Sequence, residues 1–86
     1  MRQTALLRRI ISCPRNARFA DLVTLARAFG FVLDRIKGSH HIFKHPNIPE
    51  LLNFQEVDGK GKPYQIRQFL DLVERYRLTL GEETKA

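Results

Sequence analysis

The stretch F31-V-L-D-R-I-K-G-S-H-H-I-F-K-H45 decides the fold of this 86-residue chain. Each half is rich in β-branched and aromatic residues, and a Gly-Ser pair separates the halves. This pattern predicts a hairpin of two strands, residues 31–36 and 40–45, because Gly38 can supply the positive φ that a tight turn needs. All three histidines of the chain lie within six positions behind that turn.

Strand alternation sorts the hairpin side chains onto two faces. Lys37 and His40 close the turn as a cross-strand pair and therefore share a face. With them on this first face fall Phe31, Leu33, Arg35, Ile42 and Lys44, and on the second face fall Val32, Asp34, Ile36, His41, Phe43 and His45. The first face is the more basic, so we expect the second face to meet the helices. His40 is then expected on an open, basic face, and His41 and His45 as hydrogen-bonded residues on the helix side.

Two helices are predicted before the hairpin. Apolar residues recur at helical spacing over residues 4–12, and a second apolar stripe runs over residues 19–29. Asn16 is the predicted N-cap of the second helix, and Gly30 is placed to end it.

A third strand and a last helix are predicted after the hairpin. The strand is expected over residues 51–57, after a loop whose Pro46 and Pro49 cannot donate ladder hydrogen bonds. Pro63 suits the first turn of a helix whose apolar stripe runs to about Leu78. The predicted order is helix, helix, three strands and helix. It defines an α+β sandwich in which helices cover one face of a small antiparallel sheet and the other face stays open.

The net charge of +6 is unevenly distributed along the chain. Residues 1–44 carry nine basic and two acidic side chains, whereas residues 45–86 carry six and seven. Such a field favours an anionic partner, either a phosphate backbone or an acidic protein. Cys13 is the only cysteine, which excludes an intrachain disulfide and predicts a reducing, cytoplasmic compartment. No apolar run is long enough to span a bilayer, so no membrane association is expected.

The side chains expected around His40 suit cleavage of RNA without a metal. Asn53 and Gln55 join the open face if Leu52 and Phe54 of the third strand point to the core. An imidazole exchanges protons near neutral pH, so it can take a proton from a ribose 2′-hydroxyl or give one to a leaving 5′-oxygen. Neighbouring lysines can stabilise the charge that develops on the phosphoryl group.

Plainer interpretations of the same residues stay open at this point. A surface histidine is more often an ordinary polar residue than a catalyst. A metal site is not expected, because alternation sends His40 and His41 to opposite faces and no cysteine is near, and no other cofactor is indicated. Lys60 and Lys62 precede a helix N-terminus, where they either grip phosphate or form an ordinary solvated loop.

Several segments, in order along the chain, resemble the HicA family of toxins from bacterial type II toxin–antitoxin systems. They are a helix that ends in F29-G30, the turn G38-S-H-H-I-F43, the H45-P46 loop, L52-N-F-Q55, and G59-K-G-K-P-Y-Q-I-R-Q68 before a helix. The likeness covers about residues 17–79. We therefore expect one domain over residues 1–86, made of an N-terminal helical extension (1–16), a HicA-like core (17–79) and a frayed C-terminus (80–86).

The resemblance implies a fold like that of double-stranded-RNA-binding domains, with an α-β-β-β-α core to which this chain adds an N-terminal helix. It also implies a metal-independent endoribonuclease that cuts mRNA, and a HicB-like antitoxin that covers the active site. In that family the catalytic histidine follows the Gly-Ser turn, which corresponds to His40, with the adjacent His41 as the rival. Gly38 then shapes the turn, and the RNA-binding residues are expected to be Lys37, Lys44, Arg35, Ser39, Lys60 and Lys62.

Two other functions fit the same residues. One is an RNA-binding module of this fold without catalysis, in which His40 only stacks or hydrogen-bonds. The other is an adaptor whose basic face binds an acidic protein. Both predict that RNA is not cleaved. The N-terminal helix can pack on the core, contact the antitoxin or support self-association, and the oligomeric state is left open.

Overall fold

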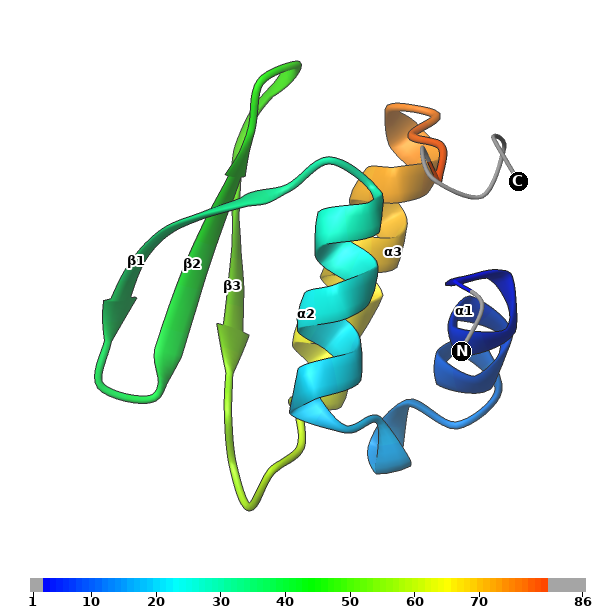
Figure 1. Cartoon of the computed structure of the whole chain (residues 1–86), viewed down its shortest axis with the longest axis vertical. Coiled ribbons are helices and arrows are strands. Elements are labelled where there is room, and N and C mark those ends of the chain that lie inside the picture. The colour runs from blue at the N-terminus through cyan, green and yellow to red at the C-terminus, as the bar shows by residue number, and fades with distance from the viewer. Residues whose placement is uncertain (1–2, 81–86) are drawn as a thin grey trace.

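A computed structural model describes residues 3–80 of the chain (Figure 1). The elements, in order, are α1 (Gln3–Ser12), the 3₁₀ turn η1 (Pro14–Asn16), α2 (Phe19–Ala28), β1 (Val32–Lys37), β2 (His40–His45), β3 (Ile48–Gln55) and α3 (Pro63–Arg75). The three strands form one antiparallel sheet in the order β1-β2-β3. Helices α2 and α3 lie against one face of this sheet, and α1 lies on their far side (Figure 1). The predicted α+β fold, an α-β-β-β-α core with an added N-terminal helix, is confirmed.

The core lies between the sheet and the helices and is built around aromatic rings. Its largest fully buried side chains are Phe31, Phe43, Phe54, Phe69, Leu22, Leu25, Leu52 and Ile66. The Phe54 ring meets that of Phe69 edge-on at 5.5 Å between centroids, and that of Phe43 at 6.0 Å. Each buried Phe removes enough apolar surface from water to stabilise the fold by about 1.5–3 kcal/mol. Leu6 and Ile10 of α1 are buried in the same core.

A β-bulge at Asp34 changes which β1 side chains face the helices. Leu33 pairs with Phe43 and Arg35 pairs with Ile42, so Asp34 is the extra residue between two ladder positions. Leu33 consequently turns to the helix side and packs against the core. Simple alternation had placed it on the basic face. The predicted position of Val32 on the helix side is wrong for the same reason, because Val32 pairs with Lys44 and is 53% exposed.

Beyond the bulge, towards the turn, the predicted register is confirmed. Lys37 pairs with His40, and Ile36 pairs with His41. Ile36 nevertheless stays exposed, because it lies in an edge strand. Phe31, which alternation assigned to the basic face, precedes β1 and is buried in the core.

Strand β3 begins earlier and ends earlier than predicted. It starts at Ile48 and contains Pro49, although a proline cannot donate a ladder hydrogen bond. The sheet tolerates Pro49 because β3 is an edge strand and because its register shifts between the pairs Phe43–Leu52 and His45–Ile48. Val57, predicted inside the strand, instead forms an isolated bridge with Lys60.

The predicted N-cap of α2 is wrong. Asn16 lies in η1, and its side-chain amide donates to the Cys13 sulfur at 3.4 Å. Arg18 occupies the N-cap position, and its side chain makes no capping hydrogen bond. The Phe19 N–H donates to the Gly59 carbonyl at 2.8 Å, so the loop after β3 satisfies one of the N–H groups that a helix start leaves unpaired.

Helix α3 starts at Pro63 as predicted but stops at Arg75, short of Leu78. Arg77 adopts a left-handed φ of 54°, the Leu78 N–H donates to the Val73 carbonyl, and the Arg77 N–H donates to the Glu74 carbonyl. These two hydrogen bonds form a Schellman cap, which ends the helix without the glycine that usually supplies the left-handed residue.

Side chains at the end of α3 tie the helix to β3. The Tyr76 hydroxyl donates to Glu50 at 2.7 Å, and the Arg75 guanidinium donates to Glu50 at 3.0 Å. The hydrogen bond to Glu50 raises the pKa of Tyr76, and the nearby charge of Asp71 raises the pKa of Arg75.

Residues 81–86, most of the tail that we expected to fray, lie outside the described residues, and Leu80 packs half-buried against the core. Within residues 3–80, none of the helices combines the length and the apolar character needed to cross a membrane.

Candidate active site

His40 is the first residue of β2 and follows the tight turn at Gly38 and Ser39. Gly38 adopts a positive φ of 59°, which costs glycine little and other residues more. The turn pairs His40 with Lys37 across the hairpin, so both side chains lie on the face of the sheet that the helices leave open. Leu52 and Phe54 are buried, which turns Asn53 and Gln55 to this open face as predicted.

Asn53 holds the His40 imidazole in one tautomer. The ring Nδ1 lies 3.2 Å from the Asn53 side-chain oxygen. An amide oxygen can only accept a hydrogen bond, so Nδ1 must carry the proton and donate it. The remaining nitrogen, Nε2, is then an unprotonated base in the neutral ring. His40 itself is half-buried, which limits the orientations of the ring.

The turn that carries His40 is fastened to β3. The Glu56 N–H donates to the Ser39 carbonyl at 2.9 Å, and the Gln55 side-chain amide donates to the Ser39 hydroxyl at 3.3 Å. Gln65 of α3 supports this contact from behind, because its side-chain oxygen accepts from the Gln55 backbone N–H at 2.7 Å. Gln65 is only 2% exposed, so the acceptor lies in the core and the hydrogen bond as a whole is partly buried.

His41 and His45 lie on the helix side. The His41 ring packs on the Phe19 ring at 4.6 Å, and its Nδ1 lies 3.4 Å from the Ser39 carbonyl. His45 is 8% exposed, and both of its nitrogens are engaged. Nδ1 accepts from the Asn47 N–H at 3.0 Å, and Nε2 donates to the Phe29 carbonyl at 3.1 Å. The predicted separation of His40 from these two residues is therefore confirmed.

The three cations expected on the open face have different surroundings. The bulged Asp34 forms ion pairs with Arg35 at 2.5 Å and with Lys44 at 3.6 Å. Among residues 3–80, no carboxylate lies within ion-pair distance of Lys37. Lys37 is also the cross-strand neighbour of His40, so it is the cation that the structure brings nearest to the imidazole in the ladder.

Lys60 and Lys62 lie in the loop between β3 and α3, at the same end of the molecule as the Gly38–Ser39 turn (Figure 1). Asp58 and Gly59 both have positive φ, and the Val57 and Lys60 backbones bond to each other around them. Lys62 is the N-cap residue of α3 and makes no side-chain capping hydrogen bond. Both lysines therefore lie near the turn, in a loop that is separate from the strand that carries His40 and that also carries the acidic Glu56 and Asp58.

Two contributors to this site, Asp34 and Gln65, were missed by the sequence analysis. Asp34 pairs with Arg35 and Lys44 because the bulge turns it toward them, and nothing in residues 31–37 indicates a bulge. Gln65 could have been found from one signal, since it lies four residues before Phe69 on the apolar stripe of α3, where a polar side chain needs a buried partner.

Within the part of the chain that the structure describes, residues 3–80, no three His, Cys, Asp or Glu side chains lie together as metal ligands would. His40 and His41 are adjacent in sequence but lie on opposite faces of the sheet.

These observations define a class of protein: a small basic α+β domain with two helices behind a three-stranded sheet and an oriented imidazole on its open face. Comparison with known proteins then identifies the family. The family model described as HicA toxin of bacterial toxin-antitoxin matches residues 19–72, more than half of the chain. The chain therefore belongs to the HicA toxin family, and this membership implies RNA as the general target and a cognate antitoxin as the partner. No curated protein and no solved structure matches the chain.

Proposed function

We propose that this toxin is a metal-independent endoribonuclease that cleaves mRNA with His40 as its acid–base residue. The observation that carries the proposal is the hydrogen bond from His40 Nδ1 to Asn53, which leaves Nε2 as a base on the open, basic face. A general base must be oriented before it is useful, and this contact orients it.

The proposed reaction begins with an RNA strand lying over the open face. His40 Nε2 takes the proton of a ribose 2′-hydroxyl, whose oxygen attacks the adjacent phosphorus. The bond from phosphorus to the 5′-oxygen breaks, and the 5′-oxygen takes a proton from the imidazolium or from water. The products are a 2′,3′-cyclic phosphate and a 5′-hydroxyl. Lys37 stabilises the negative charge that grows on the phosphoryl oxygens.

The other proposed RNA contacts divide by position. Lys60 and Lys62 bind phosphates near the turn, and Ser39 with Gly38 presents His40 to the strand. Arg35 and Lys44 bind phosphates further along the hairpin. Their ion pairs with Asp34 reduce the positive charge that they offer to RNA. A HicB-like antitoxin that covers this face would block RNA from all of these residues at once and would thereby silence the toxin.

Replacement of His40 by alanine tests the proposal. His40→Ala should lower cleavage of a labelled RNA by roughly two to four orders of magnitude, the usual loss when an acid–base group is removed. It should also abolish growth arrest on induction. The thermal midpoint should change little, because truncating a partly exposed side chain usually alters stability by about 0.5 kcal/mol.

His41→Ala is the matched control, because it removes the adjacent imidazole from the opposite face. It should keep most of the cleavage but lose stability, since the packing of His41 on Phe19 is worth about 0.5–1.5 kcal/mol. The reverse result, with a folded His41→Ala inactive and His40→Ala active, would make His41 the catalyst. If the purified parent and both variants bind RNA but none of them cuts it, the chain is an RNA-binding module only.

A further inference from the structure

Tyr64 is the second residue of α3 and carries an exposed aromatic ring. The chain holds six phenylalanines and two tyrosines, all of them within residues 3–80, and it holds no tryptophan. Every phenylalanine is buried. Tyr76 is half-buried, and its hydroxyl donates to Glu50. Tyr64 is 50% exposed, so it is the phenylalanine or tyrosine that is most open to solvent.

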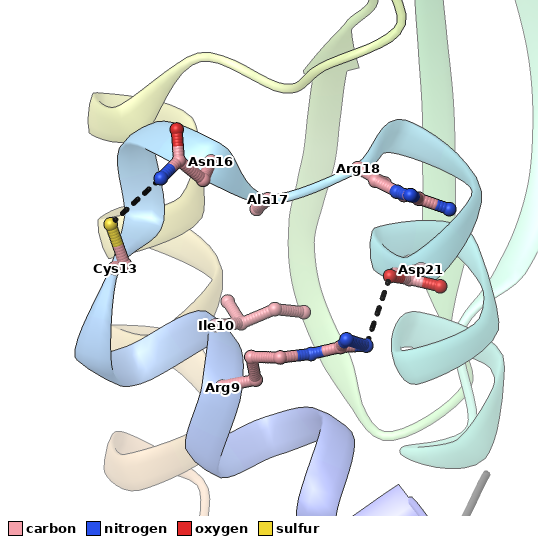
Figure 2. Close-up of a pocket in the computed structure, with 7 residues that line it drawn as sticks. All are labelled: Arg9, Ile10, Cys13, Asn16, Ala17, Arg18 and Asp21. Atoms are coloured by element: carbon pink, nitrogen blue, oxygen red, sulfur yellow. Dashed lines mark hydrogen bonds and ion pairs between the residues drawn. The ribbon is translucent and has the colours of Figure 1, made fainter.

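An exposed aromatic ring is a surface on which a nucleobase can stack, because every base has a flat π-face. The hollow between α1 and α2 offers no such surface (Figure 2). Arg9 reaches across it toward Asp21 at 3.9 Å, and none of the residues that line it is aromatic. Within residues 3–80, Tyr64 is therefore the aromatic residue best placed by its exposure to meet a base.

A short series of hydrogen bonds links Tyr64 to the strand beside His40. The Gln65 side-chain amide donates to the Tyr64 hydroxyl at 3.4 Å, and the Gln65 side-chain oxygen accepts from the Gln55 N–H at 2.7 Å. Gln55 is the ladder partner of His40. Gln65 is buried, so it ties the first turn of α3, and with it the hydroxyl of Tyr64, to the end of β3.

Tyr64 consequently lies near the free edge of the sheet. Strand β3 is an edge strand, and the Glu56 N–H points inward, to the Ser39 carbonyl on the β2 side. Successive N–H groups of an antiparallel strand point in opposite directions, so the Gln55 N–H points outward, where Gln65 accepts it. The first turn of α3 therefore lies beside the outer edge of β3.

The open face leads to this edge. Lys37 pairs with His40, and His40 pairs with Gln55, so the three residues form a row that crosses the strands. An RNA strand that follows the row past Gln55 leaves the sheet at the edge beside the first turn of α3 (Figure 1). A base close to the cleaved bond then comes near the Tyr64 ring.

Charge does not account for binding of RNA at this edge. Lys60 and Lys62 precede Tyr64, but Glu56 and Asp58 lie in the same loop and offset their charge. Attraction of phosphates depends on a surplus of positive charge, whereas stacking on a ring does not. An RNA strand that crosses this edge therefore needs a contact of another kind, which an exposed ring can provide.

We propose that Tyr64 stacks on a nucleobase of the bound RNA, next to the bond that His40 cleaves. The inference rests on the proposed ribonuclease function, because it requires RNA on the open face. The contact does not depend on the identity of the base, since any base can stack on an aromatic ring. Tyr64 thereby positions the strand for cleavage and favours single-stranded RNA, whose bases are free to leave their own stack.

The test uses the full chain with Tyr64→Leu or Tyr64→Phe, in a His40→Ala background so that RNA is bound but not cut. Binding is measured to one single-stranded oligoribonucleotide whose cut site has been mapped with the active protein. Tyr64→Leu keeps an apolar side chain but loses the ring, and it should bind roughly tenfold more weakly, the scale of one base–aromatic stack. Tyr64→Phe keeps the ring and loses only the long hydrogen bond from Gln65, so it should bind like its parent.

Abasic nucleotides locate the stacked base. The same RNA is prepared with one base missing at a time on either side of the cut. With Tyr64 present, one abasic position should weaken binding by the same factor as Tyr64→Leu does. In Tyr64→Leu that position should cause no further loss, because two partners of one contact are not additive. The salt dependence of binding should keep its slope, since Tyr64→Leu removes no phosphate contact.

Val57→Ala is the matched control, because Val57 is an apolar residue of the loop after β3 that is 43% exposed and has no ring. It should bind RNA like the parent and leave the abasic pattern unchanged. Equal losses in Val57→Ala and Tyr64→Leu would overturn the stacking role, as would a Tyr64→Phe variant as weak as Tyr64→Leu, or full additivity with every abasic position. If the active parent neither binds nor cuts RNA, the proposed ribonuclease function falls together with the stacking. If the parent cuts RNA and Tyr64→Leu binds it normally, only the stacking is refuted.

Discussion

Three histidines with the same intrinsic chemistry have three different surroundings in this protein. His45 is buried, with Nδ1 accepting from one backbone N–H and Nε2 donating to a backbone carbonyl. His41 packs on Phe19 at the margin of the core. His40 lies on the open face, and Asn53 engages only one of its nitrogens. His40 and His41 each engage Nδ1 in a hydrogen bond, so at the scale of the residue it is the face of the sheet that separates the proposed catalyst from its neighbour.

Substitution of Asn53 tests this view of His40. Asn53→Leu removes the acceptor for Nδ1 and should lower cleavage by roughly tenfold, about the loss of one hydrogen bond in the transition state. Asn53→Asp places a carboxylate at the same point and favours the imidazolium, so the rise of the cleavage rate with pH should move to higher pH. The measurement is the pH–rate profile of each variant on one labelled RNA.

Gln55→Leu serves as the control for Asn53, because Gln55 is the ladder partner of His40 on the open face but its side-chain amide hydrogen-bonds to the Ser39 hydroxyl. The pH–rate profile of Gln55→Leu should have its midpoint at the same pH as that of the parent. A profile that is identical in the parent and in Asn53→Asp would contradict the positioning role of Asn53.

At the scale of the element, the bulge in β1 and the cap of α3 affect the structure more than the intrinsic conformational preferences of their residues do. The bulge lets Val32 and Lys37 lie on the same open face while Leu33 packs into the core, and it turns the Asp34 carboxylate toward two cations. The cap of α3 uses Arg77 in a conformation that L-residues other than Asn and Asp rarely adopt. Both features have consequences that can be measured.

Asp34→Asn should strengthen RNA binding. The substitution removes the carboxylate that pairs with Arg35 and Lys44 but keeps the size of the side chain, so both cations become available to phosphate. We expect an affinity gain of roughly two- to fivefold at low salt and a steeper salt dependence. Asp71→Asn, which changes the net charge equally but removes a partner of Arg75 on α3, is the control and should have a much smaller effect.

Arg77→Gly should stabilise the protein. Glycine adopts the left-handed region without the penalty that a Cβ atom imposes, so we expect a gain of about 0.5–1 kcal/mol and a rise in thermal midpoint of about 2–8 °C. Arg67→Gly removes the same side chain from within α3, where glycine is unfavourable, and should destabilise by a similar amount. A fall in midpoint for both variants would contradict the left-handed cap.

At the scale of the whole molecule, one end gathers the groups on which the proposed function depends. The Gly38–Ser39 turn, the end of β3, the loop to α3 and the start of α2 all meet there (Figure 1). Helices α2 and α3 both begin at this end, so their positive dipole ends add to the field of the lysines. In the proposed function an RNA strand meets this end of the molecule, where Glu56 and Asp58 offset the charge of Lys60 and Lys62, so Lys37 and the helix dipoles provide the positive field.

Chelation of divalent ions tests whether the positive groups of the protein are sufficient for cleavage without a metal. Cleavage by the proposed mechanism should continue in excess EDTA at close to its original rate, because proton transfer and charge stabilisation are assigned to His40 and Lys37. A metal-dependent nuclease in the same buffer serves as the control and should stop. Loss of cleavage in EDTA with recovery on adding a divalent ion would refute the mechanism.

The sequence by itself determined the features that depend on neighbours along the chain. Alternation behind the Gly38–Ser39 turn was enough to set His40 and His41 on opposite faces, since the strand period allows no other outcome within a regular hairpin. Apolar periodicity likewise defined the three helices and the open sheet face, and the position of Pro63 marked the start of α3. These features follow from backbone geometry over a few residues.

Only the tertiary structure decided the features that depend on distant segments. The bulge at Asp34 exists because Leu33 gains burial against a core that the helices complete, and alternation alone cannot anticipate that gain. The start of α2 at Phe19 depends on the loop after β3, which supplies the hydrogen bond that the expected Asn16 cap does not make. Asn53 was placed on the correct face by pattern, but its contact with His40 required the register of β3 against β2, which is set across the sheet and not within a strand.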